Sequence, residues 1–180
     1  MNAMLKPSYL TVADFLEWEN EQGARHELLE GDIVAMSGGT VAHAGLTLAM
    51  GARLFNHLQG APCRVFTSDL KVQAAENVFY PDVVVSCAEQ ENEDVLCKEP
   101  KLIIEVLSNS TSYRDHHKKR LAYQQIGSLE EYALIAQEVK HVEIYRRAED
   151  WRVSVYTDGV IELRSVELTL ALDDVYTGVI

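Results

Sequence analysis

The sequence predicts an α/β (α+β) fold in which a mixed β-sheet is flanked by helices. A segment with apolar residues at helical spacing precedes three strand-like runs, and a second helical segment separates these runs from further strands. A hairpin pattern near the N-terminus and an antiparallel extension near the C-terminus complete the order. With 180 residues, of which 47% are hydrophobic, the chain can bury one sizeable core. We therefore expect residues 1–180 to form a single domain.

The first third of the chain combines a short helix, a hairpin and a longer helix. Thr11 followed by Asp14 resembles a capping box, and the helical pattern continues until Gly23. Residues 27–36 have the pattern of a hairpin. Apolar residues then recur at helical spacing over residues 43–58, and this segment is predicted to be a packed helix.

Three strand-like runs follow this helix. They comprise residues 64–74, 82–87 and 102–107. The acidic loop 89–99 separates the last two runs, and its stretch 89–94 lacks the spacing and the glycine of a calcium loop. We interpret it as a solvated loop.

The rest of the chain is predicted to contain a helix and an antiparallel group of strands. The helix is expected over residues 112–126, with Ser110 or Ser112 as its N-cap. Strand patterns then occur at 132–136, 141–146, 151–157 and 160–163. Asp158-Gly159 is a strong turn signal and predicts a hairpin between the last two of these strands.

The charge of the chain limits the functions that it can have. The formal net charge is −12 and the pI is about 4.9. Nonspecific coating of nucleic acid needs clustered Lys and Arg, so any DNA-facing surface must be local.

Cysteine usage and hydropathy indicate where the protein works. The chain has three cysteines without a CxxC spacing, a pattern that fits reduced thiols better than a disulfide framework or a zinc site. Neither a basic flank with a long apolar stretch at the N-terminus nor a run of eighteen apolar residues occurs. We expect a cytoplasmic protein that neither is exported nor spans a membrane.

Two acidic residues lie in segments that are otherwise apolar. Glu105 stands in the middle of the run 101–107, and Asp82 follows Pro81 at the start of a β-branched run. Burial of an ionised carboxylate costs several kcal/mol unless it is paired or bound to a metal. If the two strands are neighbours, the carboxylates converge in the way that hard divalent cations are held.

These acids belong to a set of motifs spread over nearly the whole sequence. The set comprises the 27–31 hairpin, His43, Tyr80-Pro81-Asp82-Val83-Val84, Ile103-Ile104-Glu105-Val106-Leu107-Ser108, Asp115, Lys119, Tyr123 and Glu131-Tyr132. Their order resembles the PD-(D/E)xK nuclease superfamily and, more closely, the stand-alone Uma-two family, which is usually labelled as restriction endonucleases. The resemblance implies a restriction-endonuclease-like αβββαβ core.

The lysine of the superfamily motif is displaced in this chain. It usually lies two residues after the strand acid, but that position is Leu107 here. Asp115, Lys119 and Tyr123 share one face of the following helix, which is expected to lean toward the sheet, whereas Lys118 would point away. Lys119 matches the Uma-two pattern.

The resemblance implies metal-dependent hydrolysis of DNA phosphodiester bonds by a homodimer. Asp82, Glu105 and the carbonyl of Val106 would hold Mg²⁺ or Mn²⁺, and Lys119 would orient the attacking water or steady the phosphate. His43 and Glu30 are candidates for an outer role. Asp115 and Tyr123 are further accessory candidates.

Each of these residues also has a structural interpretation. Glu105 and Lys119 could form a structural ion pair, and Tyr123 could be a packed core aromatic. Asp115 could stabilise the first turn of its helix, and Glu30 beside a turn could simply be solvated. The alternative function is accordingly a catalytically inactive nuclease fold that binds a partner or nucleic acid without cutting it.

Overall fold

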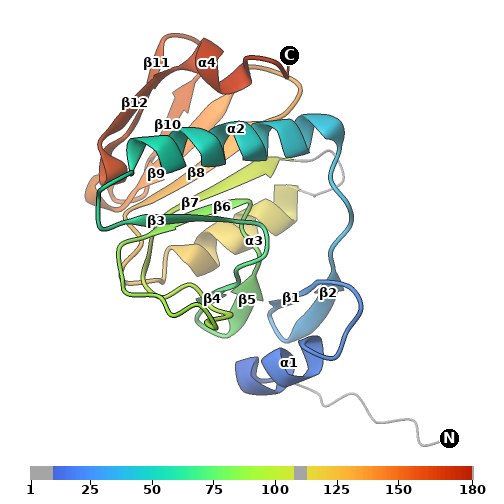
Figure 1. The fold of residues 1–180 in the computed structure, drawn as a ribbon. Helices are drawn as coiled ribbons and strands as arrows, with labels where there is room; N and C mark the ends of the chain where they lie inside the picture. The colour runs from blue at the N-terminus through green and yellow to red at the C-terminus, as the bar shows by residue number, and fades with distance from the viewer. Residues whose placement is uncertain (1–9, 108–112, 180) are drawn as a thin grey trace, which may run out of the picture.

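The protein is built around a six-stranded mixed sheet with the order β10-β9-β8-β7-β6-β3, and Figure 1 shows α2 and α3 on its opposite sides. The computed structural model describes residues 10–107 and 113–179, without the side chains of residues 113–116. The strands of this sheet are β3 (Arg64–Thr67), β6 (Val83–Ser86), β7 (Pro100–Leu107), β8 (Glu131–Ala136), β9 (Val142–Arg146) and β10 (Val153–Tyr156). β7 and β8 run parallel, and the other neighbours in this sheet are antiparallel. The predicted mixed sheet flanked by helices is confirmed.

Two smaller sheets accompany the central one. A four-stranded sheet has the order β2-β1-β5-β4, and a two-stranded sheet pairs β11 with β12. The strands are β1 (His26–Leu29), β2 (Asp32–Ala35), β4 (Val72–Ala74), β5 (Asn77–Phe79), β11 (Val160–Leu163) and β12 (Leu168–Ala171). β1 and β2 form the hairpin that the sequence predicts near the N-terminus.

Two of the described helices begin at a threonine that caps the first turn. The helices are α1 (Val12–Glu19), α2 (Val41–His57), α3 (Tyr113–Tyr123) and α4 (Leu172–Tyr176). Thr11 caps α1 by accepting a hydrogen bond from the Asp14 N–H, and Thr40 caps α2 in the same way. The predicted caps of α3, Ser110 and Ser112, lie outside the described residues. Within the described part of the chain, no helix is long and apolar enough to cross a bilayer.

The sheet separates two apolar layers because successive side chains of a strand point to opposite faces. Along β7, Ile104 and Val106 join the layer that contains Leu46, Met50 and other residues of α2. Ile103 belongs to the layer on the α3 side. Glu105 lies two residues after Ile103 on the same strand, so its side chain points to the same face of the sheet, toward α3.

The run 64–74 is two strands rather than the single strand that we expected. β3 belongs to the central sheet and β4 to the four-stranded sheet. Between them Ser68 adopts a left-handed backbone conformation with φ +45°, which turns the chain out of the first sheet. β5 was not predicted, and it pairs with both β1 and β4.

The expected hairpin at Asp158-Gly159 is also wrong. β10 pairs with β9, whereas β11 pairs with β12 in a separate sheet. The buried side chains of Ile161 and Leu163 draw β11 into the apolar layer on the α2 side. β12 and α4, which follow, were not predicted from the sequence. Burial against the central core, rather than local turn chemistry, decides where this segment lies.

The expectation of reduced thiols is wrong for two of the three cysteines. Cys63 and Cys87 form a disulfide, while the buried Cys97 is free. The strands explain the pairing, because the register that aligns Arg64 of β3 with Ser86 of β6 continues outward to bring these two cysteines face to face. The sequence contains no spacing motif that could reveal such a cross-strand neighbour.

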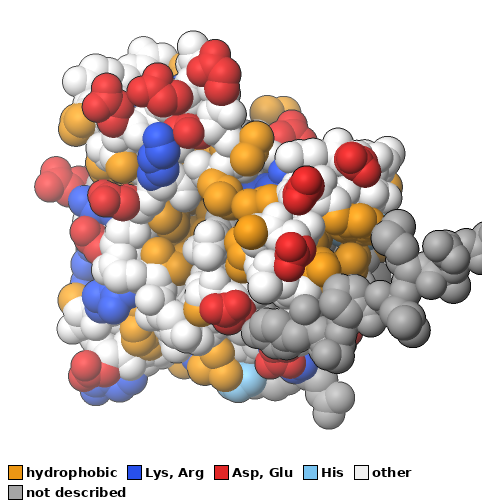
Figure 2. Space-filling view, turned by 90° about the horizontal axis from the view of Figure 1, so that it is seen from below, with side chains coloured by type: hydrophobic (Ala, Val, Ile, Leu, Met, Phe, Trp, Pro, Cys, Tyr) orange, Lys and Arg blue, Asp and Glu red, His pale blue; other side chains and the backbone are white. Residues whose placement is uncertain are grey.

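On the face that Figure 2 shows, acidic side chains are scattered rather than gathered at one place. Figure 2 views the molecule from the side on which α1 lies in Figure 1, and acids are scattered there among apolar side chains. The basic side chains in this view are interspersed with acids. Charges of both signs are therefore mixed on this face.

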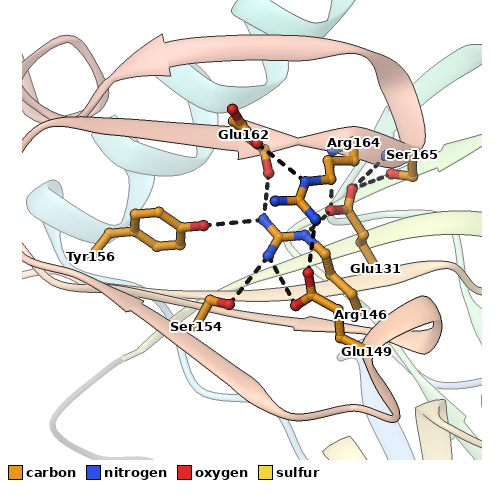
Figure 3. A network of polar contacts seen from close by, with 8 residues as sticks. All are labelled: Glu131, Arg146, Glu149, Ser154, Tyr156, Glu162, Arg164 and Ser165. Carbon is orange, nitrogen blue, oxygen red and sulfur yellow. Dashed lines mark hydrogen bonds and ion pairs between the residues drawn. The ribbon is translucent and has the colours of Figure 1, made fainter.

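A network of polar contacts around the buried pair Arg146 and Glu131 ties the C-terminal strands together (Figure 3). Arg146 Nε donates to Glu131 Oε1 at 2.8 Å, and the two side chains are only 3% and 2% exposed. The other nitrogens of Arg146 contact Glu149, Ser154, Tyr156 and the carbonyl of Glu162. Glu131 in turn accepts from the backbone N–H of Arg164 and from both the N–H and the hydroxyl of Ser165.

Candidate active site

The two acids that the sequence singles out lie opposite each other on neighbouring strands. The antiparallel register of β6 and β7 aligns Val83 with Ile104, so that Asp82, directly before β6, lies across from Glu105. Asp82 Oδ2 accepts a hydrogen bond from the backbone N–H of Val106 at 2.7 Å. This bond holds the Asp82 carboxylate against β7, beside the residue that follows Glu105.

The Glu105 side chain is buried, with 7% of its surface exposed. Its Oε1 accepts a hydrogen bond from the Tyr123 hydroxyl at 2.9 Å and lies 3.7 Å from Lys119 Nζ. Burial raises the pKa of Glu105 to about 7, and the Lys119 ammonium opposes this rise while Asp82 adds to it. The charge on this carboxylate therefore depends on positive charge close to it.

Lys119 reaches the acids from α3, where it lies four residues before Tyr123 on the same helical face. Its Nζ lies 2.7 Å from Glu27 Oε1, 3.7 Å from Glu105 Oε1 and 5.3 Å from the centre of the Phe79 ring. Burial disfavours the charged form, but Glu105 and Glu27 outweigh this effect and raise the pKa of Lys119. Lys119 is therefore an ammonium held between two carboxylates.

Glu27 is a member of this cluster that the sequence analysis missed. It lies on β1, its side chain is 10% exposed, and its Oε1 also accepts a hydrogen bond from the Tyr80 N–H at 3.1 Å. A signal was present, because Glu27 is an acid followed directly by Leu28 and Leu29 in a predicted strand. Like Glu105, Glu27 is an acid next to apolar residues of a strand, but the polar residues His26 and Glu30 nearby make its burial less evident from the sequence.

His43 approaches Asp82 from the first turn of α2. Its Nε2 lies 3.2 Å from Asp82 Oδ1, and the hydrogen bond to Asp82 raises the pKa of His43 against the opposing effect of burial. A Cβ atom on Gly39 would lie only 2.9 Å from His43 Nδ1, so glycine at this position leaves room for the ring. His43 can thus orient the Asp82 carboxylate from the side opposite Val106.

The remaining accessory candidates are distributed differently. Glu30 has a side chain that is 62% exposed and pairs with Lys118, so it lies apart from the buried acids. Lys118 points away from the cluster, as the helical spacing predicts. Tyr123 is buried in the apolar layer and still reaches Glu105 with its hydroxyl. The side chain of Asp115 lies outside the described residues.

A groove of about 560 Å³ opens beside the cluster, and both His43 and Asp82 line it. One wall is formed by α2, which contributes the buried Thr47 and the 60% exposed Phe55. The buried hydroxyl of Thr47 has no hydrogen-bond partner within the described residues. Arg25 contributes a positive charge to the rim. The groove therefore gives solvent and ligands a route to Asp82.

The donor atoms suit a divalent cation of the Mg²⁺ type. Among the described residues, the hydrogen bond and the ion pair of Glu105 both use Oε1, so Oε2 can serve as a ligand. In this part of the chain no group of three or more His, Cys, Asp or Glu side chains is arranged to hold a metal. Mg²⁺ is commonly bound through one or two carboxylates and keeps several waters, so Asp82 and Glu105 fit it.

Comparison with known sequences relates almost the whole chain to one family. The family model Uma2, described as "Putative restriction endonuclease", matches residues 12–173. An uncharacterized protein of Synechocystis sp. is 32% identical, over 94% of this chain and 92% of the relative. A second uncharacterized protein of Synechocystis sp. is 33% identical, over 78% of this chain and 82% of the relative.

Comparison with solved structures supports the same fold. The crystal structure of a "putative nuclease" from Anabaena variabilis superimposes with a TM-score of 0.82 at 20% sequence identity. The match covers 95% of this chain and 99% of the other. At this level of identity the likeness shows the shared fold.

Proposed function

Because the chain belongs to the Uma2 family, whose model is described as "Putative restriction endonuclease", we propose that it is a metal-dependent endonuclease that hydrolyses DNA phosphodiester bonds. The family and the fold indicate a restriction-endonuclease-like nuclease. The identity of the metal, the catalytic residues and the DNA substrate are parts of the proposal.

One observation carries the proposal. Asp82 and Glu105 lie opposite each other on adjacent strands, on the sheet face from which Lys119 approaches to 3.7 Å of Glu105. Two carboxylates and an ammonium from three separate elements are costly to bury together. Such an arrangement is typical of sites whose groups act on a bound charge.

Each residue has a role that follows from its contacts. Asp82 and Glu105, with the carbonyl of Val106, would hold Mg²⁺ or Mn²⁺. Such an ion, when bound, lowers the pKa of a water ligand and stabilises charge on the reacting phosphate. Lys119 would orient the attacking water or contact a phosphate oxygen. His43 would keep Asp82 turned toward the site.

A second candidate function is a nuclease fold that binds a partner without cutting DNA. The net charge of −12 favours it, because an acidic molecule attracts DNA weakly. Calorimetry with Mn²⁺ distinguishes the candidates. If the site binds metal, the wild type should show a heat of Mn²⁺ binding and Glu105→Ala should show none. If the fold does not bind metal, neither protein should show a heat of binding.

The decisive experiment is plasmid cleavage with Mg²⁺ or Mn²⁺ by the wild type and by Asp82→Asn. This variant keeps the shape of the side chain but removes its charge, and a metal contributes several kcal/mol to the transition state. Cleavage should therefore fall by about a thousandfold.

Asp173→Asn is the matched control. Asp173 is 81% exposed and pairs with Lys140 on the surface, so its loss should leave cleavage unchanged. Cleavage by Asp82→Asn at the wild-type rate would refute the assigned site.

A further inference from the structure

We propose that Glu27 is a positioning residue that fixes the Lys119 ammonium beside Glu105, so that the N-terminal hairpin completes the site. This inference rests on the proposed nuclease function, and it assigns a role in that function to an element outside the central sheet. Lys119 Nζ lies 2.7 Å from Glu27 but 3.7 Å from Glu105. The shorter contact is thus to Glu27, which is not one of the proposed metal ligands.

Burial makes this contact a strong constraint on Lys119. The side chains of Lys119 and Glu27 are 12% and 10% exposed, so water competes little for either charge. A charge-assisted hydrogen bond in such surroundings is short and directional. A long lysine side chain otherwise has many rotamers, and the Glu27 carboxylate selects the one that brings Nζ to Glu105.

Glu27 can hold Lys119 because Glu27 is itself fixed. Its strand, β1, pairs with β5 through Leu28 and Val78. The oxygen that accepts from Lys119 also accepts from the Tyr80 N–H at 3.1 Å. Tyr80 lies two residues before Asp82. The Glu27 carboxylate therefore joins three parts of the site: the hairpin, the segment that leads into β6, and α3.

The contacts favour a positioning role over metal binding. Both hydrogen bonds to Glu27 Oε1, from Lys119 Nζ and from the Tyr80 N–H, connect it to groups that flank the candidate metal ligands, as a positioning role requires. Within the described residues, Glu27 does not form a group of three potential metal-binding side chains with Asp82 and Glu105. If Glu27 were nevertheless a ligand, its loss would weaken Mn²⁺ binding. If it acts through Lys119, Mn²⁺ affinity should be retained.

The same two elements contain a matched pair that serves as a control. Glu30, three residues after Glu27, pairs with Lys118, the neighbour of Lys119. Those side chains are 62% and 36% exposed. The hairpin and α3 thus carry one buried and one exposed Glu–Lys pair, and each variant can be compared with its counterpart.

The test of positioning is the rate at which acetic anhydride labels each lysine, followed by mass spectrometry in the wild type, Glu27→Gln and Glu30→Gln. The reagent reacts with the neutral amine, so the loss of a carboxylate partner should speed up labelling. Glu27→Gln should accelerate labelling of Lys119 by about tenfold and leave Lys118 unchanged. Glu30→Gln should not alter Lys119. Thermal unfolding confirms that each variant is folded.

The functional consequence is tested by a double-mutant cycle with Lys119→Met. Glu27→Gln should lower kcat for DNA cleavage by about a hundredfold, because misplacement of a catalytic group by about 1 Å has that effect. KM and Mn²⁺ affinity should stay within about twofold of wild type. The double variant should be no slower than Lys119→Met alone, and if Glu27→Gln alone fails to fold, the double variant avoids a buried Lys119 ammonium that has lost its closer partner.

The two hypotheses fail in different ways. A wild-type protein that leaves DNA uncut would count against the nuclease function. Unchanged labelling of Lys119 in Glu27→Gln would overturn the positioning role, whatever the activity. A loss of Mn²⁺ affinity as large as that in Glu105→Gln would overturn it in favour of metal binding by Glu27.

Discussion

Carboxylates in apolar strands are the residue-level feature that defines this site. Glu105 was found because a charge inside a buried strand requires compensation. The structure supplies that compensation through Tyr123 and Lys119. Glu27 has the same character, but its place in a short hairpin with polar neighbours concealed its burial. Its partner on α3 is 92 residues away in the sequence, and no local pattern links the two.

Replacement of Glu105 by Gln separates function from stability. We expect the heat of Mn²⁺ binding to disappear, while the free energy of unfolding stays within about 1 kcal/mol of wild type or rises, because a neutral group replaces a buried charge. Lys119 keeps its closer partner, Glu27. Calorimetry and urea denaturation measure the two effects. A destabilisation above about 3 kcal/mol would support the structural ion pair instead.

The lowered pKa of Glu19 leads to a prediction of how the free energy of unfolding depends on pH. Burial tends to raise the pKa of Glu19, but hydrogen bonds from Tyr80 and Lys71 outweigh it and lower the pKa below 4.5. The folded state therefore binds fewer protons than the unfolded state, and this stabilisation is present above pH 4.5 and is lost as the pH falls through the folded pKa. Glu19→Gln should cost about 3–5 kcal/mol near pH 7, because it leaves the 7% exposed Lys71 unpaired.

Urea denaturation of wild type and Glu19→Gln over a range of pH provides the measurement. The difference in unfolding free energy should shrink as the pH falls below 4.5 and through the folded-state pKa of Glu19, because Glu19 then becomes protonated in the wild type. A difference that stays constant with pH would show that the Glu19 charge is not responsible.

At the scale of elements, periodicity predicted most helices and strands, but pairing partners were harder to infer. α2, β6, β7 and β8 follow from strong apolar patterns. The break between β3 and β4 depends on Ser68, whose left-handed conformation no residue preference reveals. Asp158-Gly159 has the chemistry of a hairpin turn, but the strands on its two sides pair elsewhere.

Within the network around Arg146, we expect the buried Arg146 side chain to contribute most to stability. Arg146→Met should destabilise the protein by about 3–5 kcal/mol, because Glu131 would remain buried without its cation. Arg164 belongs to the same network but is 57% exposed, so Arg164→Met should cost less than about 1 kcal/mol. Chemical denaturation compares the two variants. Equal effects would mean that burial does not determine the contribution of this network.

At the scale of the whole molecule, the net charge limits how strongly the protein can bind DNA. The net charge is −12. We therefore expect the dissociation constant for a short DNA duplex, measured in EDTA at physiological salt, to be above about 10⁻⁴ M. A divalent cation should strengthen this binding, because Asp82 and Glu105 would otherwise repel phosphate. Fluorescence anisotropy with Ca²⁺ or EDTA measures both states. Micromolar binding in EDTA would contradict this expectation. The homodimer stays a prediction.

The sequence by itself determined the family, the fold class and the residues Asp82, Glu105 and Lys119 as candidates, because each leaves a local mark: an acid in an apolar strand, or a lysine on an inward helical face. The tertiary structure alone decided which distant side chains meet. Glu27 joins Lys119, His43 reaches Asp82, and Cys63 bonds to Cys87. These contacts arise from sheet register and helix placement, which depend on the packing of the whole core and leave no trace in local spacing.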